Sequence, residues 1–240
     1  MMLLQLEEVY SRYGHVNALK GISFDVPQGS IVALLGANGA GKTTTLRTIS
    51  GTLRPTSGAI AFAGRSITHV PPERMPDMGL VHVPEGRGVF FQLTVAQNLL
   101  LGGGRRTKSD QFKEAQERVY QLFPMLYEKR NHLVSLLSGG QQQMLSLGRA
   151  LLSQPKLLMV DELSFGLAPI VVKELFKLVE TLNREGMTIL LVEQNVGLAL
   201  KVAHHAYVLS TGRIVTSGPA RDLASDEDLV QAYLGAQQGG

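Results

Sequence analysis

Gly36-Ala37-Asn38-Gly39-Ala40-Gly41-Lys42-Thr43 fits the pattern G-x-x-x-x-G-K-[ST]. A loop of this kind joins a buried strand to a helix, and its backbone N–H groups form a cradle for phosphate groups. A glycine-rich turn that only joined the two elements would leave the Lys-Thr pair unexplained. We therefore expect a nucleotide-binding P-loop in an α/β fold, with Lys42 reaching the β and γ phosphates and the Thr43 hydroxyl holding magnesium. The nucleotide-binding residues predicted here are Gly36, Asn38, Gly39, Ala40, Gly41, Lys42, Thr43 and Thr44.

Two carboxylates follow a second apolar run. Residues 157–160 read Leu-Leu-Met-Val, which predicts a buried strand, and Asp161 and Glu162 come directly after it. Ligands of open parallel sheets gather at the carboxyl ends of the strands. An Asp-Glu pair after a strand is more often an ordinary loop start, but the P-loop reverses that preference. We expect Asp161 to hold magnesium and Glu162 to orient or deprotonate the attacking water, which makes Glu162 and Lys42 catalytic candidates.

Ser138-Gly139-Gly140-Gln141 forms a second candidate anion site at a predicted helix start. Such a start offers free N–H groups, a hydroxyl and close approach of the backbone. One nucleotide does not need two such sites in one chain. We therefore expect these four residues to cover the phosphates of an ATP held by a second subunit.

Apolar periodicity predicts a P-loop NTPase core with a mostly parallel sheet, an amino-terminal antiparallel β layer and an inserted helical subdomain. The expected strands cover residues 3–10, 22–26, 31–35, 59–62, 81–83, 157–160 and 189–192. The expected helices cover residues 42–50 and 111–126, with Pro124 marking the end of the second, and a further helix starts at Ser138. We expect a single domain over residues 1–240. Residues 1–86 and 154–240 would form the core with its β layer, and residues 87–153 the helical subdomain.

Composition excludes several classes of protein. The 240 residues are 44% hydrophobic and 18% charged, which indicates a globular chain, and no apolar run approaches the ~18–20 residues of a membrane span. The amino terminus lacks a basic segment before its apolar residues, so no signal peptide is expected. The net charge is +3 and the pI about 9.2, but the basic residues are scattered or, as at residues 105–108, flanked by acids, so no nucleic-acid partner is expected. The absence of cysteine excludes disulfides and thiolate metal sites.

The motifs in this order resemble the ATP-binding subunits of ABC transporters over essentially the whole chain. Three strings are similar to the shorter ATPase of bacterial branched-chain amino acid importers: Val-Pro-Glu-Gly-Arg at 83–87, Leu-Thr-Val-Ala-Gln-Asn-Leu at 93–99 and Leu-Val-Glu-Gln-Asn at 191–195. The resemblance implies an ATPase with ATP and Mg²⁺ as cofactors. By the same resemblance, the chain is expected to energise the import of branched-chain amino acids. Import of another small solute, such as urea or a short amide, is the alternative, and a soluble ABC ATPase without a transport role is a more distant one.

The resemblance also assigns roles to residues. Tyr13 falls where the family stacks an aromatic ring on adenine, although Tyr10 is a rival and a core or turn tyrosine the plainer interpretation. Glu85 stands where most members have a glutamine that contacts magnesium, so it joins Thr43 and Asp161 as a metal candidate. Gln194 stands where most members have a histidine that contacts the γ-phosphate, so it joins the catalytic candidates.

Partners and location follow from the same resemblance. It implies a dimer with a sister ATPase or with itself, docked on integral membrane permease subunits at the cytoplasmic face of the inner membrane. A solute-binding protein on the other side would act indirectly. Phe90 and Phe91 are candidates for the groove that receives a permease helix, with two core phenylalanines as the equal alternative. Ala168 replaces the aspartate that commonly ends the loop after Glu162, so a cross-dimer contact through that aspartate is in doubt.

Overall fold

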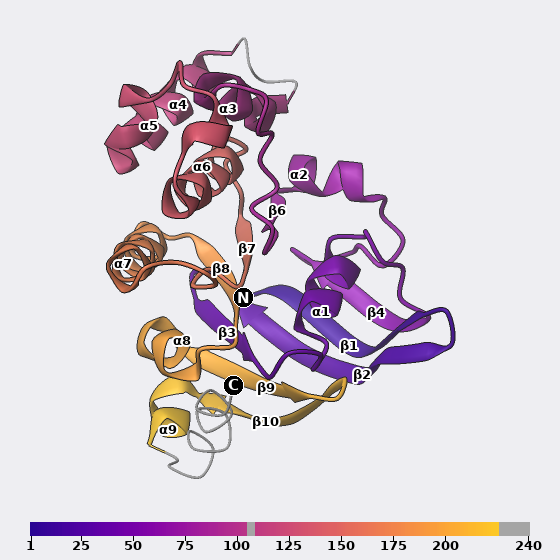
Figure 1. The fold of residues 1–240 in the computed structure, drawn as a ribbon. Helices are drawn as coiled ribbons and strands as arrows, with labels where there is room; N and C mark the ends of the chain where they lie inside the picture. The colour runs from indigo at the N-terminus through magenta and orange to yellow at the C-terminus, as the bar shows by residue number, and fades with distance from the viewer. Residues whose placement is uncertain (105–108, 226–240) are drawn as a thin grey trace.

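The computed structural model describes residues 1–104 and 109–225 (Figure 1). The basic group at 105–108 therefore lies outside the described residues. The first of two sheets is antiparallel, in the order β2-β1-β4-β5. Its strands are β1 (Met2–Tyr13), β2 (Val16–Pro27), β4 (Ser57–Phe62) and β5 (Arg65–Ser66). This sheet is the β layer predicted at the amino end, with strands longer than expected because β1 and β2 pair along almost their whole length.

The second sheet has the order β10-β9-β3-β8-β7-β6 and carries the P-loop. Its strands are β3 (Ile31–Leu35), β6 (Leu80–Val83), β7 (Leu157–Asp161), β8 (Thr188–Glu193), β9 (His205–Ser210) and β10 (Arg213–Pro219). All neighbours from β9 to β6 are parallel, and only β10 pairs antiparallel with β9. The mostly parallel core predicted from the sequence is confirmed.

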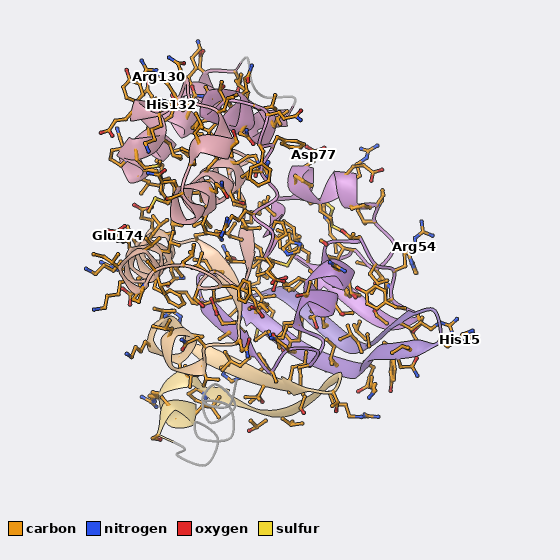
Figure 2. All side chains as sticks on the ribbon, viewed as in Figure 1. His15, Arg54, Asp77, Arg130, His132 and Glu174 are labelled. Carbon is orange, nitrogen blue, oxygen red and sulfur yellow. The ribbon has the colours of Figure 1, made fainter. Side chains whose placement is uncertain are left out.

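The helices group by position along the chain. They are α1 (Lys42–Ile49), α2 (Met75–Met78), α3 (Val95–Gly103), α4 (Asp110–Leu122), α5 (Pro124–Glu128), α6 (Gly139–Leu151), α7 (Pro169–Arg184), α8 (Val196–Val202) and α9 (Ala220–Ala224), with 3-10 turns at Pro72–Arg74 and Val134–Leu136. Figure 1 shows α3 to α6 gathered at one end of the molecule, beyond the edge strand β6. Figure 2 shows Arg130 and His132 at the outer part of this helical end.

One predicted helix is divided in two. Residues 111–126 were expected to form a single helix, but α4 ends at Leu122 and α5 begins at Pro124. Phe123 between them has φ −133° and ψ 73°, outside the helical region. Steric conflict with the proline ring drives the preceding residue out of that region. Pro124 therefore ends one helix, as predicted, and also starts the next.

Strand β3 shows how the central sheet separates two cores. Its side chains alternate between faces, as strand geometry requires. Ile31, Ala33 and Leu35 join the apolar cluster formed with α7, α8 and the helical end. Val32 and Leu34 join the cluster formed with the antiparallel sheet and α1. All five side chains are buried, so the P-loop begins at the end of a strand fixed on both faces.

The parallel strands bring distant parts of the chain to one edge. Because β3, β6, β7 and β8 run in the same direction, the segments that leave their carboxyl ends lie along the same side of the sheet. These segments are the P-loop after β3, the loop with Glu85 after β6, the loop with Glu162 after β7 and Gln194 after β8. The sheet thus gathers the residues that the sequence proposes for catalysis and metal binding.

Candidate functional site

A pocket of about 350 Å³ opens at this edge of the sheet, and we refer to it as the P-loop pocket. Its lining residues are Ala18, Asn38, Gly39, Gly41, Lys42, Thr43, Thr44, Glu85, Glu162 and Phe165. Sequence reasoning named eight of these ten and missed Ala18 and Phe165. Phe165 follows Glu162 by three residues in one loop, which was the one available signal. Ala18 lies in β2 of the other sheet and left no signal in the sequence.

Two positions of the P-loop require glycine for steric reasons. Gly41 precedes the first residue of α1 with φ 112°, a conformation that L side chains rarely adopt. A Cβ on Gly36 would collide with the carbonyl oxygen of Leu209 in β9 and would lie 3.0 Å from Cβ of Ala40. The loop therefore turns tightly against β9 and enters α1 with its backbone N–H groups free to face a ligand.

Lys42 is buried inside the loop rather than extended into solvent. Its Nζ donates to the carbonyl oxygens of Gly36 at 2.8 Å and Ala37 at 3.2 Å. The same atom lies 3.2 Å from Oε1 of Glu162, and the two side chains are 4% and 9% exposed. The lysine is thus pre-positioned between the start of its own loop and the carboxylate after β7. An anionic ligand in the pocket would compete with these oxygens for the ammonium group.

Asp161 has the features of a metal ligand. The residue is fully buried at the end of β7, and neither of its carboxylate oxygens has a hydrogen-bond partner among the described residues. Burial raises the pKa of Asp161 to about 6, with Glu162 and Glu85 contributing in the same direction against Thr43 and Lys42. The Thr43 hydroxyl lowers this pKa, but it forms no hydrogen bond of normal geometry with either oxygen. A buried carboxylate with so little compensation is costly unless a cation satisfies it. The oxygen ligands available from Thr43, Asp161 and Glu85 are the type that Mg²⁺ prefers.

Glu162 has a strained backbone held by its neighbours. Its φ is +48°, in the left-handed region, which a non-glycine residue occupies only where the surroundings impose it. Its N–H donates to the Val192 carbonyl at 2.8 Å, and its own carbonyl accepts from the Phe165 N–H at 3.2 Å. The side chain then reaches Lys42. Strain of this kind at a pocket is a pointer to function.

Residues 138–141 cap the amino terminus of helix α6 and do not belong to the P-loop pocket. Ser138 Oγ accepts from the Gln141 N–H at 3.3 Å, and Gln141 Oε1 accepts from the Ser138 N–H at 3.1 Å. This reciprocal pair is a capping box. A Cβ on Gly140 would lie 2.7 Å from the Val171 side chain, so α6 begins directly against α7. Within the described chain, none of residues 138–141 lines the P-loop pocket.

The sequence of this chain matches a known protein family. A family model described as ABC transporter matches residues 19–164, which include the P-loop, Glu85, Ser138–Gln141 and Glu162. The chain belongs to this family. It is an ABC-type ATPase, and a solved ATP-binding cassette of an ABC transporter in its ADP conformation has the same fold, with a TM-score of 0.86, 28% identity and coverage of 98% of this chain and 99% of that one.

Two relatives in the family are similar along the whole chain. The high-affinity branched-chain amino acid transport ATP-binding protein BraG of Pseudomonas aeruginosa is 44% identical over 233 residues, covering 97% of this chain and all of the relative. The lipopolysaccharide export system ATP-binding protein LptB of Acidithiobacillus ferridurans is 34% identical over 237 residues, covering 98% of each. The family thus includes transporters with very different cargo, and the greater identity is to an amino acid transporter.

Three site predictions fall outside the P-loop pocket or at its edge. Glu85 is exposed and lines the pocket. Gln194 directly follows β8 and is half-buried, but it is not among the described residues that line the pocket. Tyr13 ends β1 with 43% exposure, and its hydroxyl accepts from Arg47 Nη1 at 3.3 Å. It does not line the described pocket either, so its contact with adenine stays a prediction.

A larger groove of about 770 Å³ shares none of its described lining residues with the P-loop pocket of this ABC ATPase. Its lining includes Asp77 of α2, His82 of β6, Leu101 of α3, Arg149 of α6 and, from the connection between β6 and α3, Phe90 (Asp77 is labelled in Figure 2). Phe90 and Phe91 are 54% and 51% exposed, so the alternative that they are core residues is wrong. Asn98 holds the backbone of Phe90 by accepting from its N–H and donating to its carbonyl, at 2.8 and 2.9 Å.

Of the described residues, no helix is long and apolar enough to cross a membrane. The aromatic side chain of Phe90 is exposed at the groove, and an exposed apolar side chain of this size favours contact with another protein. Burial of the Phe90 ring in a partner would remove apolar surface from water. Arg149, which also lines the groove, lies with its Cζ 5.7 Å from the centroid of this ring.

Proposed function

We propose that this chain is the ATP-binding and hydrolysing subunit that energises the import of branched-chain amino acids through an ABC transporter. The observation that carries the proposal is the P-loop pocket, where Lys42 and Glu162 meet beside the unpartnered carboxylate of Asp161. The 44% identity to BraG over 97% of the chain supports the choice of solute. Identity of 34% to LptB shows that the shared fold alone does not select a cargo.

The residues divide the work of hydrolysis by position. The N–H groups at the start of α1 and the ammonium of Lys42 bind the phosphates and stabilise the charge that develops on them. The carboxylate of Glu162 accepts a proton from the attacking water, and Gln194 donates its amide N–H toward the γ-phosphate. Thr43, Asp161 and Glu85 would hold Mg²⁺, which, when bound, neutralises charge on the β and γ phosphate oxygens. Tyr13 stacks on the adenine.

Assembly completes the site. Residues 138–141 lie away from the P-loop pocket of their own chain, so we propose that they close on the ATP of a second subunit, a sister ATPase or another copy. The groove with Phe90 receives a segment of an integral membrane permease at the cytoplasmic face of the inner membrane. A solute-binding protein acts through that permease. Residues 87–153 are, in this proposal, a helical subdomain, and residues 1–86 with 154–240 are the core.

The test is uptake of labelled leucine into membrane vesicles that contain this chain, its sister ATPase, the permease subunits and the solute-binding protein. ATP-dependent uptake that disappears without this chain supports the proposal. Uptake that persists without it removes the chain from the transporter. Uptake of urea or a short amide instead of leucine would keep the mechanism and overturn the solute.

A further inference from the structure

Glu193 is a buried carboxylate for which the proposed mechanism has no use. It is the last residue of β8, one position before Gln194, and is 1% exposed. None of the ion pairs formed by residues 1–104 and 109–225 includes it. Burial raises its pKa, hydrogen bonds from Ser164 and, more weakly, from the Asn195 backbone oppose the rise, and the nearby Glu162 adds to it. Burying an ionisable group costs free energy, so the burial of Glu193 indicates that its carboxylate has a specific role.

Both oxygens of Glu193 bind one residue of the loop after Glu162. Oε1 accepts from the Ser164 N–H at 3.0 Å, and Oε2 accepts from the Ser164 hydroxyl at 2.8 Å. Each donor of Ser164 thus has a carboxylate oxygen of its own, whereas an amide in place of Glu193 would offer one acceptor oxygen and a donor NH₂ group. The pair is thus a two-point clamp between β8 and the loop, although 29 positions separate the residues in sequence.

The clamp completes a set of contacts that hold Glu162 against β8. Strands β7 and β8 are neighbours, with Asp161 opposite Val192. On one side of its strained backbone, the Glu162 N–H binds the Val192 carbonyl. On the other side, the turn closed by the Phe165 N–H and the Glu162 carbonyl contains Ser164, which Glu193 holds. Both ends of the turn that aims the Glu162 side chain are therefore attached to the same strand.

We propose that Glu193 is a positioning residue for ATP hydrolysis, whose carboxylate clamps Ser164 and thereby fixes the direction of the Glu162 carboxylate. This inference rests on the role of Glu162 in the proposed function. Without the clamp, the turn relaxes toward less strained backbone conformations and the Glu162 carboxylate leaves its position beside Lys42. Neither Ser164 nor Glu193 lines the described P-loop pocket, so binding of ATP itself does not depend on them.

The separation of catalysis from binding provides the test. ATP hydrolysis by the full chain is measured at a fixed protein concentration over a range of MgATP concentrations. We expect Ser164→Ala and Glu193→Gln each to lower kcat about tenfold, the loss typical of one well-placed hydrogen bond, with KM unchanged within about twofold. The double variant should be no slower than the slower single variant, because both changes open the same clamp.

Two further variants separate positioning from general stability. Ser164→Thr keeps the hydroxyl and should retain most of the wild-type kcat that Ser164→Ala loses. Thr181→Ala removes a hydroxyl whose one hydrogen bond among the described residues is to the Lys177 carbonyl in its own helix α7, and it should hydrolyse ATP at the wild-type rate. If Glu193→Gln does not fold, Ser164→Ala and Ser164→Thr decide the question together.

The outcomes distinguish this inference from the proposed function. A wild-type kcat in Ser164→Ala, or losses that add fully in the double variant, would overturn the clamp. A rise in KM with kcat unchanged would also overturn it, because that result places the pair in ATP binding. Glu162→Gln is measured in parallel. Its full activity would remove the base role of Glu162, whereas a slow Glu162→Gln beside a fast Ser164→Ala would remove only the clamp.

Discussion

The ammonium nitrogen of Lys42 lies 3.2 Å from the carboxylate oxygen Oε1 of Glu162, and both side chains are almost completely buried. Lys42 is the first residue of α1, after the P-loop that follows β3, and Glu162 directly follows β7. Strand β7 lies two positions from β3 in the sheet. Each charge compensates the loss of hydration of the other. Removing one partner of a buried pair leaves the other uncompensated, at a typical cost of about 3–5 kcal/mol. The two groups that we assign to phosphate binding and water activation are therefore also linked in stability.

Lys42→Ala should nearly abolish ATP hydrolysis. The variant removes the cation that we assign to the β and γ phosphates, and loss of a charge-assisted hydrogen bond alone lowers the rate about tenfold or more. It also leaves Glu162 buried without its partner, so the midpoint of urea unfolding should fall. Steady-state hydrolysis is compared with that of Lys201→Ala, which changes an exposed lysine of α8. Turnover near the wild-type rate in Lys42→Ala would refute the assignment.

Glu162→Gln should bind ATP but hydrolyse it slowly. The amide keeps the shape of the side chain but cannot accept the proton of the attacking water. Unhydrolysed ATP then holds two subunits together through residues 138–141. Size-exclusion chromatography with and without MgATP should show more dimer in this variant than in Glu174→Gln, whose side chain projects outward from α7 (Figure 2). Rapid hydrolysis in Glu162→Gln would place the base elsewhere.

Gln194→His should leave an active enzyme. The half-buried side chain follows β8 at the carboxyl edge of the sheet, and both an amide and an imidazole present an N–H donor. The expected kcat lies within about tenfold of the wild-type value, the scale of one altered hydrogen bond. A folded but inactive histidine variant, with an unchanged circular dichroism spectrum, would show that Gln194 has a geometric role that a donor alone does not replace.

The P-loop, Asp161 and Glu162 could be predicted together because each follows a continuous apolar run. Such runs identify buried parallel strands, and parallel strands deliver their loops to one edge. Hairpin β9–β10 was not predicted, because β10 has no buried residue and its polar positions conceal the strand. Its partner β9 nevertheless constrains the P-loop, because the Leu209 carbonyl leaves no room for a side chain at Gly36.

The contacts that complete the site could not be predicted. Ala18 reaches the P-loop pocket from the other sheet, and its approach depends on how the two sheets pack. Ser164 lies in the loop after β7 and Glu193 ends β8, and the pairing of these two strands brings the residues together. Exposure of Phe90 likewise depends on tertiary packing, which is why sequence reasoning left its core and groove interpretations equal.

His82→Gln should make the protein less sensitive to acid. Burial, with a smaller effect of Arg47, lowers the pKa of His82 from 6.5 to about 4, and its buried Nε2 has no hydrogen-bond partner in the described chain. The unfolded chain therefore takes up a proton near pH 6.5 that the folded protein accepts only near pH 4. The free energy of unfolding consequently falls as the pH is lowered through this window, by up to about 2 kcal/mol at pH 5.

Urea unfolding of wild type and His82→Gln at pH 7.5 and pH 5 measures this effect. The variant should lose up to about 2 kcal/mol less than wild type on acidification, because glutamine does not titrate. Asp161 acts in the opposite direction, since its raised pKa of about 6 makes the folded state bind protons first as the pH falls. Its contribution is present in both proteins and cancels in the comparison. Equal losses in wild type and variant would mean that the buried imidazole of His82 is protonated as readily in the folded protein as in the unfolded chain.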